Sequence, residues 1–263
     1  MCIGCHSRYF GIGVLSAKNG GQRPPMLSHG LRWSRRGVLA GAAVMAAAPW
    51  VAGGAAAQGA ASPQNAISPD AALKRLLDGN ARYVANTPAT RDYSAGRAAR
   101  VTAQYPVAAV LSCADSRVAP ELAFDQGPGD LFVVRIAGNF ASNDGIASLE
   151  YAVQFLNVPL VMVLGHTNCG AIDAAIKVLT DNTALPGRLP QLVASLRPAV
   201  ALAQTQGPTN LLDHSIVENV RWNQSQLGNA EPILANAAGT GKIKIVGGVY
   251  DLPTGKVNIV NPR

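Results

Sequence analysis

Aromatic and charged side chains are both scarce in this sequence, at 5% and 14% of its 263 residues. A chain with so little charge and 48% hydrophobic residues can bury a substantial core, so wholesale disorder is excluded. Acidic residues are absent from residues 1–57, which hold six of the 22 lysines and arginines. The other 206 residues carry 16 basic and 15 acidic side chains, which argues against nucleic-acid binding by that part.

Residues 1–57 have the pattern of an export signal. The adjacent Arg35 and Arg36 precede an apolar stretch at about 37–52, and three consecutive alanines end at Ala57. A positive segment, an apolar segment and a small-residue end are typical of a secretory signal, and paired arginines indicate the twin-arginine export machinery. The stretch is short and rich in alanine for a membrane span. We therefore expect cleavage near Ala57 and a periplasmic protein without a stable membrane anchor.

The first 25 residues are unusual for such a signal, and Met26 would be a more ordinary start, so an over-long start is one interpretation. The run Cys2-Ile3-Gly4-Cys5-His6 matches the c-type haem attachment pattern. Haem is attached to the mature part of an exported protein, and this motif precedes the expected cleavage site. We therefore expect no haem.

Short apolar runs alternate with helical patterns along residues 58–263. This alternation predicts one α/β domain, with a mostly parallel β-sheet flanked by helices. Strands are expected at 107–113, 131–136, 160–164, 243–250 and 257–260, and helices at 68–86, 146–156, 171–179 and 215–227. Four prolines between residues 181 and 210 predict a loop-rich segment there.

Cysteine and histidine are nearly absent after residue 57, where only Cys113, His166, Cys169 and His214 occur. Cys113 closes the first predicted strand, and His166 and Cys169 follow the third. Because open α/β sheets bind ligands beyond the carboxyl ends of parallel strands, these three side chains are expected to converge. Two thiolates and one imidazole are donors that Zn²⁺ favours. His214 is expected to cap a helix or lie on the surface.

The same two cysteines allow an alternative, because an oxidising periplasm favours a structural disulfide. His166, together with Asp115 and Arg117 beside Cys113, favours a metal site instead. A disulfide-stapled or zinc-binding protein without catalytic activity therefore stays open as an interpretation of these residues.

Two motifs resemble the zinc signature of the β-class carbonic anhydrases. Residues Cys113 to Arg117 have the pattern Cys-x-Asp-x-Arg, and His166 to Cys169 have the pattern His-x-x-Cys, which starts 53 residues after Cys113. The similarity runs from about residue 73 to 260. Further blocks similar to this family lie at Gly79–Tyr83, Gly129–Arg135, Glu150–Val153 and Gly247–Asp251.

The resemblance implies reversible hydration of CO2 to bicarbonate by a zinc-bound hydroxide. One Zn²⁺ per subunit would be held by Cys113, His166 and Cys169. Asp115 would accept a hydrogen bond from the hydroxide, and Arg117 would hold Asp115 ionised. The resemblance also suggests five substrate-pocket positions, which are Gln104, Phe132, Ala137, Tyr151 and Gly170.

A homodimer or homotetramer is also implied, with the N-terminal helix at 68–86 packed on a partner subunit. A hydrolase of CS2 or COS with the same fold is an alternative, since the metal motif is shared.

Some family members close the site by letting the aspartate bind zinc, and several of those carry Trp three residues before the first cysteine. Here that position is Val110. We therefore expect the open form, with Asp115 as a fourth ligand in the alternative closed form.

Overall fold

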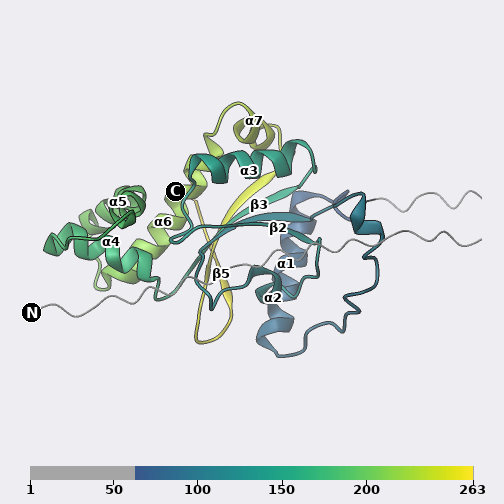
Figure 1. Cartoon of the computed structure of the whole chain (residues 1–263), viewed down its shortest axis with the longest axis horizontal. Coiled ribbons are helices and arrows are strands. Elements are labelled where there is room, and N and C mark those ends of the chain that lie inside the picture. Colours follow the sequence, from purple (N-terminus) through teal and green to yellow (C-terminus); the bar gives the residue numbers. More distant parts are fainter. Residues whose placement is uncertain (1–62, 263) are drawn as a thin grey trace, which may run out of the picture. The chain divides into compact units, whose positions relative to one another are not determined.

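The computed structural model describes residues 63–262 (Figure 1). The chain divides into two units, Met1–Ala56 and Ala57–Arg263, and the described residues belong to the second. The predicted export signal, the alternative start and the haem-type motif all lie outside the described residues.

Five strands form one sheet in the order β2-β1-β3-β4-β5. Strands β1 to β4 all run parallel to one another, and β5 runs antiparallel to β4. The bounds are β1 Ala108–Ser112, β2 Leu131–Arg135, β3 Leu160–His166, β4 Lys244–Tyr250 and β5 Val257–Val260. The predicted fold class is confirmed, and each predicted strand lies within two residues of an observed one.

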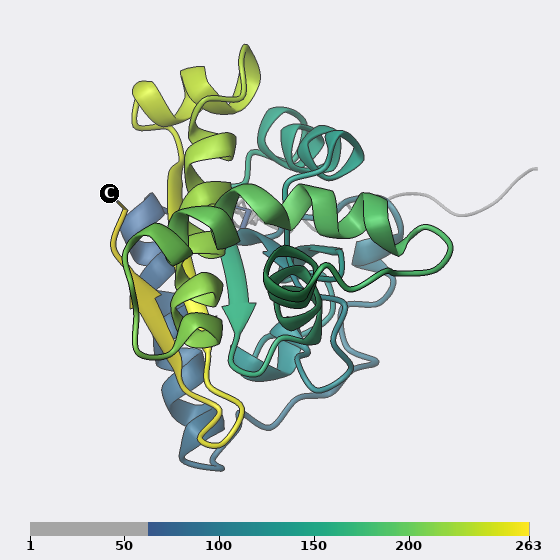
Figure 2. The same ribbon diagram turned by 90° about the vertical axis from the view of Figure 1, so that its left-hand side faces the viewer.

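Helices cover both faces of the sheet, with α1 and α2 on one face and α3, α6 and α7 on the other (Figures 1 and 2). Along β1, Ala108 and Val110 face α1, while Ala109 and Leu111 face the opposite core. Burial on both faces explains why residues 108–111 of this strand are all apolar. The helix bounds are α1 Pro69–Val84, α2 Pro120–Ala123, α3 Asn143–Gln154, α4 Gly170–Asp181, α5 Leu189–Thr205, α6 Leu211–Gly228 and α7 Ile233–Gly239, with a 3₁₀ turn η1 at Ala99–Val101.

Helix α1 begins as predicted, because the Ser68 hydroxyl accepts a hydrogen bond from the Ala71 N–H at 3.2 Å. Its buried Asn80 donates to the Gly255 carbonyl at 2.8 Å and accepts from the Val257 N–H at 2.9 Å. These bonds hold α1 against the β4–β5 hairpin, and Figure 2 shows the blue helix beside the yellow strand. The adjacent Gly79 allows a different close approach, to the end of α2, since a Cβ there would lie 1.8 Å from the Phe124 backbone oxygen.

The prediction of a loop-rich segment at 181–210 is wrong, because α5 occupies most of it. Pro190 lies in the first helical turn, where its missing N–H has no intrahelical partner to lose. Pro198 lies inside the helix, where it removes one hydrogen bond. Packing outweighs this cost, since α5 contacts both α4 and α6 and buries Val193, Leu196, Ala199, Val200 and Ala203.

The apolar stretch at about 37–52 lies outside the described residues. Within residues 63–262, no helix is both long enough and apolar enough to cross a bilayer.

Candidate metal centre

Cys113, His166 and Cys169 meet at the carboxyl ends of β1 and β3. The two strands are parallel neighbours, with Ser112 opposite Leu164, so their carboxyl ends lie on the same side of the sheet. The two sulfurs and an imidazole nitrogen lie within 4.8 Å of one another, and all three side chains are buried. Since β2 and β3 flank β1 on opposite sides, the cluster lies where the strand order reverses, the usual ligand position in open α/β sheets.

The imidazole of His166 is oriented by the segment that follows it. Its Nδ1 lies 2.9 Å from the Thr167 carbonyl oxygen, which can only accept, so Nδ1 carries the proton and Nε2 keeps a lone pair. That Nε2 is buried and has no hydrogen-bond partner among residues 63–262. A buried nitrogen left unpaired is unfavourable unless something binds it, and a metal ion fits this position.

The two cysteines are free thiols rather than a disulfide in this structure. Cys113 Sγ accepts a hydrogen bond from the Gly138 N–H at 3.2 Å, and Cys169 is the residue that precedes α4. A hydrogen bond between the two sulfurs lowers the pKa of Cys113 and raises the pKa of Cys169. Two sulfurs and one imidazole nitrogen are a donor set that suits zinc, which binds cysteine as the thiolate.

Asp115 and Arg117 form a two-point contact beside the cluster. Arg117 Nε donates to Asp115 Oδ1 at 2.9 Å, and Arg117 Nη2 donates to Oδ2 at 2.7 Å. These hydrogen bonds hold the pKa of Asp115 well below its usual value. Oδ2 also lies 3.7 Å from His166 Nε2, so an ionised carboxylate faces the unpaired ligand atom.

Arg135 fixes the backbone that carries this pair, a role that the sequence analysis missed. Its Nε donates to the Cys113 carbonyl at 3.1 Å, and its Nη2 donates to the Asp115 carbonyl at 2.6 Å. Arg135 is the last residue of β2, which pairs with β1 in the sheet. This position places its guanidinium near Cys113, at the carboxyl ends of the two strands. The two bonds therefore fix one zinc-ligand candidate relative to Asp115.

The five predicted pocket residues divide into two groups. Ala137 precedes Gly138, whose N–H contacts Cys113, and Gly170 follows Cys169, so both adjoin the cluster. The structure of one chain does not bring Gln104, Phe132 and Tyr151 to it. Phe132 pairs with Ala109, four residues before Cys113 and so about 13 Å away along the strand.

These three residues lie on a different surface. The Phe132 and Tyr151 rings are 6.3 Å apart between centroids, and Tyr151 lies 5.3 Å from Phe155. Gln104 is exposed at a hollow of about 230 Å³ that Phe155 also lines. His214, also on the surface, contacts the Gln206 side chain at 2.5 Å, in agreement with its predicted surface role.

Comparison with known proteins bears on this cluster directly. The family model described as "Carbonic anhydrase" matches residues 108–257, which include all three ligand candidates. A carbonic anhydrase of Mycolicibacterium smegmatis is 40% identical over 190 residues, which are 72% of this chain and 92% of that protein. A solved β-carbonic anhydrase of Coccomyxa, in complex with acetazolamide, is 30% identical with a TM-score of 0.57, over 72% of this chain and 86% of that one. The chain belongs to the β-class carbonic anhydrases.

Other relatives of this β-class carbonic anhydrase agree. Carbonic anhydrase 2 of Mycobacterium tuberculosis is 39% identical over 187 residues, which are 71% of this chain and 90% of that protein. A tetrameric β-carbonic anhydrase of Sordaria macrospora shares the fold at 24% identity, with a TM-score of 0.56 over 63% of this chain and 86% of that one. The protein is thus a carbonic anhydrase lyase, and its Cys-His-Cys group fits the zinc cofactor of this family.

Proposed function

We propose that this chain hydrates CO2 reversibly to bicarbonate, with zinc held by Cys113, His166 and Cys169. The observation that carries the proposal is a buried Cys-His-Cys group beside an aspartate that an arginine holds ionised. Zinc would supply a Lewis acid that lowers the pKa of water and makes it nucleophilic. Binding, orientation and proton control at the site depend on the side chains of the chain itself.

Asp115 is the acceptor that orients the attacking water. Because Arg117 contacts both carboxylate oxygens, Asp115 stays ionised and cannot donate a hydrogen bond. The same contacts support the open form of the site. In the closed form, Asp115 would be a fourth metal ligand, and its two oxygens would be shared between Arg117 and the metal.

The donor set also sets the expected pH dependence. Two thiolates cancel the formal charge of Zn²⁺, so this site should acidify water less strongly than a site with three histidines, where the pKa of water falls to about 7. We therefore expect the CO2 hydration rate to rise through mildly alkaline pH. A stopped-flow rate that stays flat from about pH 6 to pH 9 would contradict this proposal.

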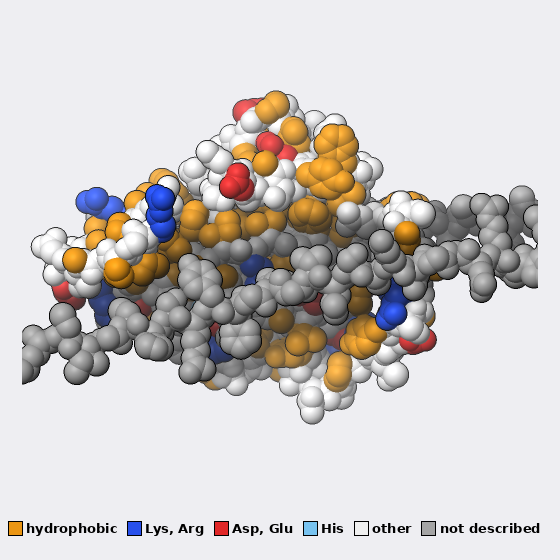
Figure 3. All heavy atoms as spheres, viewed as in Figure 1, with side chains coloured by type: hydrophobic (Ala, Val, Ile, Leu, Met, Phe, Trp, Pro, Cys, Tyr) orange, Lys and Arg blue, Asp and Glu red, His pale blue; other side chains and the backbone are white. Residues whose placement is uncertain are grey.

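A second copy of the chain is the partner that would bring Gln104, Phe132 and Tyr151 to a metal centre. Tyr151 on α3 and Phe155 directly after it are 47% and 70% exposed, and Figure 3 shows hydrophobic side chains gathered over this helix. Strand β2 beside them is an unpaired edge of the sheet. Burial of this surface in a homodimer or homotetramer would remove apolar rings from water.

Mixing two inactive variants tests this arrangement. A Cys169→Ala chain lacks a metal ligand, and a Gln104→Ala chain lacks the pocket amide. If the partner supplies Gln104, a mixed dimer has one intact site, and the mixture is more active than the two variants assayed separately. Activity equal to the sum of the separate variants, or a monomer in sedimentation, would contradict the shared pocket.

Residues 1–57 are proposed as a twin-arginine signal that delivers the protein to the periplasm. The paired Arg35 and Arg36 support this route, since it carries proteins that have already folded, and folding around zinc would protect two thiolates from oxidation. Replacement of both arginines by lysine should retain the protein in the cytoplasm. N-terminal sequencing of the periplasmic protein should place its first residue near position 58, and an unprocessed N-terminus would contradict the proposal.

The substrate assay separates the alternatives. A zinc-loaded chain that hydrates CO2 supports the proposal, whereas hydrolysis of CS2 or COS without CO2 hydration supports the other hydrolase of this fold. Thiol titration tests the non-catalytic alternative with a Cys113–Cys169 disulfide. A disulfide would leave neither cysteine reactive after metal removal.

A further inference from the structure

Helix α6 carries two buried asparagines on the face that it turns toward the metal centre. Asn219 is 1% exposed and Asn223 is 2% exposed, and apolar Ile216 and Val220 lie beside them. Residues four apart lie on one face of a helix, so the two amides are neighbours. A buried amide is unfavourable unless its donor and acceptor are both paired. The partners of these two amides therefore show what the pair does.

Both asparagines bind the segment 136–142, which connects β2 to α3. Asn219 Nδ2 donates to the Gly138 carbonyl at 2.8 Å, and Asn223 Oδ1 accepts from the Ala141 N–H at 2.7 Å. Asn223 Nδ2 donates to the Asn219 carbonyl at 2.7 Å and to its Oδ1 at 3.1 Å. The two amides thus form one connected unit that holds the segment at two points.

The same segment contacts the metal centre through Gly138. The Gly138 N–H donates to Cys113 Sγ at 3.2 Å, while its carbonyl accepts from Asn219. Its φ is +81°, and a Cβ there would lie 2.9 Å from the Leu196 side chain, so the position requires glycine. The next residue, Asn139, also has a positive φ, of +42°. A backbone of this shape is held by its surroundings, and Asn219 and Asn223 supply bonds that do so.

We propose that Asn219 and Asn223 are positioning residues for the ligand Cys113. They fix the Gly138 peptide so that its N–H points at the Cys113 sulfur. An N–H bond to a thiolate withdraws negative charge from the sulfur and fixes the direction of its lone pairs. The inference rests on the proposed zinc site, and neither asparagine touches the metal or the substrate.

Asn219→Leu tests the proposal, because leucine has a similar size and lacks both polar groups. The matched control is Asn80→Leu, which removes another buried amide that donates to two backbone carbonyls, on the opposite face of the sheet. Both variants should lose stability. Only Asn219→Leu should lower the zinc affinity, by about 10- to 100-fold in competition with a chelator. Only it should shift the thiolate-to-metal charge-transfer band of the cobalt-substituted protein.

Asn223→Leu provides a second variant, since it leaves the bond between Asn219 and Gly138 in place. It should shift zinc affinity and the cobalt band in the same direction by a smaller amount. If Asn219→Leu does not fold, Asn223→Leu alone tests whether the amide pair positions Cys113. Unchanged zinc affinity and an unchanged cobalt band in either folded variant would overturn the positioning role. These readouts use the metal alone. Zinc-loaded wild-type protein that fails to hydrate CO2 would therefore overturn the proposed function and leave this inference standing.

Discussion

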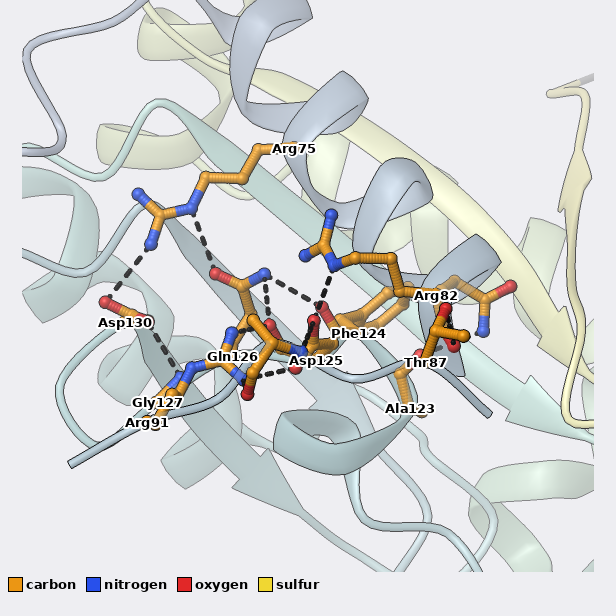
Figure 4. Close-up of polar contacts among 12 residues, drawn as sticks. Arg75, Arg82, Thr87, Arg91, Ala123, Phe124, Asp125, Gln126, Gly127 and Asp130 are labelled. Atoms are coloured by element: carbon orange, nitrogen blue, oxygen red, sulfur yellow. Dashed lines mark hydrogen bonds and ion pairs between the residues drawn. The ribbon is translucent and has the colours of Figure 1, made fainter. Parts of the chain in front are cut away.

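Two aspartate–arginine groups in this protein have the same chemistry but differ in what surrounds them. Asp125, with a side chain 2% exposed, accepts from Arg82 Nε at 2.6 Å, from the Ala89 N–H at 3.1 Å and from Arg91. Arg91 also donates to the Asp125 carbonyl. Figure 4 shows this cluster between α1 and the turn after α2. Both carboxylate oxygens of Asp125 are paired within the protein, which is the arrangement expected of a structural ion cluster.

Asp115 and Arg117 form the other group, and it is more open. Their side chains are 17% and 53% exposed, and they lie beside the unpaired Nε2 of His166. Both groups pair their carboxylate oxygens, but only Asp115 also faces an unpaired metal-ligand candidate, the Nε2 of His166. This difference identifies the candidate site better than charge does.

The pKa shifts alone would not separate the two groups. Hydrogen bonds from Arg117 lower the pKa of Asp115. Burial raises the pKa of Asp125, but hydrogen bonds from Arg91 and Arg82 outweigh it and lower that pKa to about 2. Both carboxylates are therefore ionised at neutral pH, and only geometry distinguishes their roles.

The largest expected effect comes from removing a metal ligand. Cys169→Ala should abolish both zinc content and CO2 hydration, because two remaining ligands do not hold zinc tightly. Metal analysis and a hydration assay on the same sample measure this. Ser112→Ala, which removes a buried hydroxyl next to Cys113, is the matched control and should keep zinc and activity. Intact activity in Cys169→Ala would contradict the proposed ligand set.

Asp115→Asn should lower kcat/KM for CO2 by about 10²-fold while the chain keeps its zinc, because the amide orients the attacking water poorly. Thermal unfolding should change little, since the side chain lies near the surface. Near-normal kcat/KM in the zinc-loaded variant would remove Asp115 from the mechanism.

Asp125→Asn should give the opposite pattern. Arg82 and Arg91 would then face an uncharged amide, and the free energy of unfolding should fall by about 3 kcal/mol, as measured in urea. Zinc content and kcat/KM per folded molecule should be unchanged. A larger effect on kcat/KM than on stability would show that the two groups are not separate.

Acid unfolding should show the smallest effect of the series. The folded pKa of Asp125 is about 2, below its ordinary value of 3.8, so its contribution to stability is present above the higher value and is lost as pH falls towards the lower one. Between these two values, the unmodified protein should lose stability more steeply than Asp125→Asn. Parallel curves in urea titrations across this range would contradict the assignment.

Much of the fold was predictable, because the buried strands β1 and β3 are apolar runs and Ser68-Pro69-Asp70 is a strong helix start. The sequence pattern does not predict helix α5, because Pro190 and Pro198 indicate breaks in a helix. Proline lowers helix propensity locally, but packing against α4 and α6 is a tertiary effect that no local pattern contains.

The metal ligands were predictable for a different reason, since Cys113, His166 and Cys169 are rare residue types at a distinctive spacing. The sequence carries no comparable signal for the residues that position these ligands, which are Arg135, Gly138, Asn219 and Asn223. Arg135 acts through backbone carbonyls, and an asparagine inside a helix is usually a solvated residue. The Gly138-Asn139 pair indicates a turn, but which sulfur its N–H contacts depends on how α6 packs.

X-ray absorption at the zinc edge of the purified protein tests the central claim most directly. The account predicts zinc bound by two sulfurs and one imidazole nitrogen, with one further oxygen from water, in a sample that hydrates CO2. Zinc with fewer than two sulfur ligands would contradict the assignment of Cys113, His166 and Cys169.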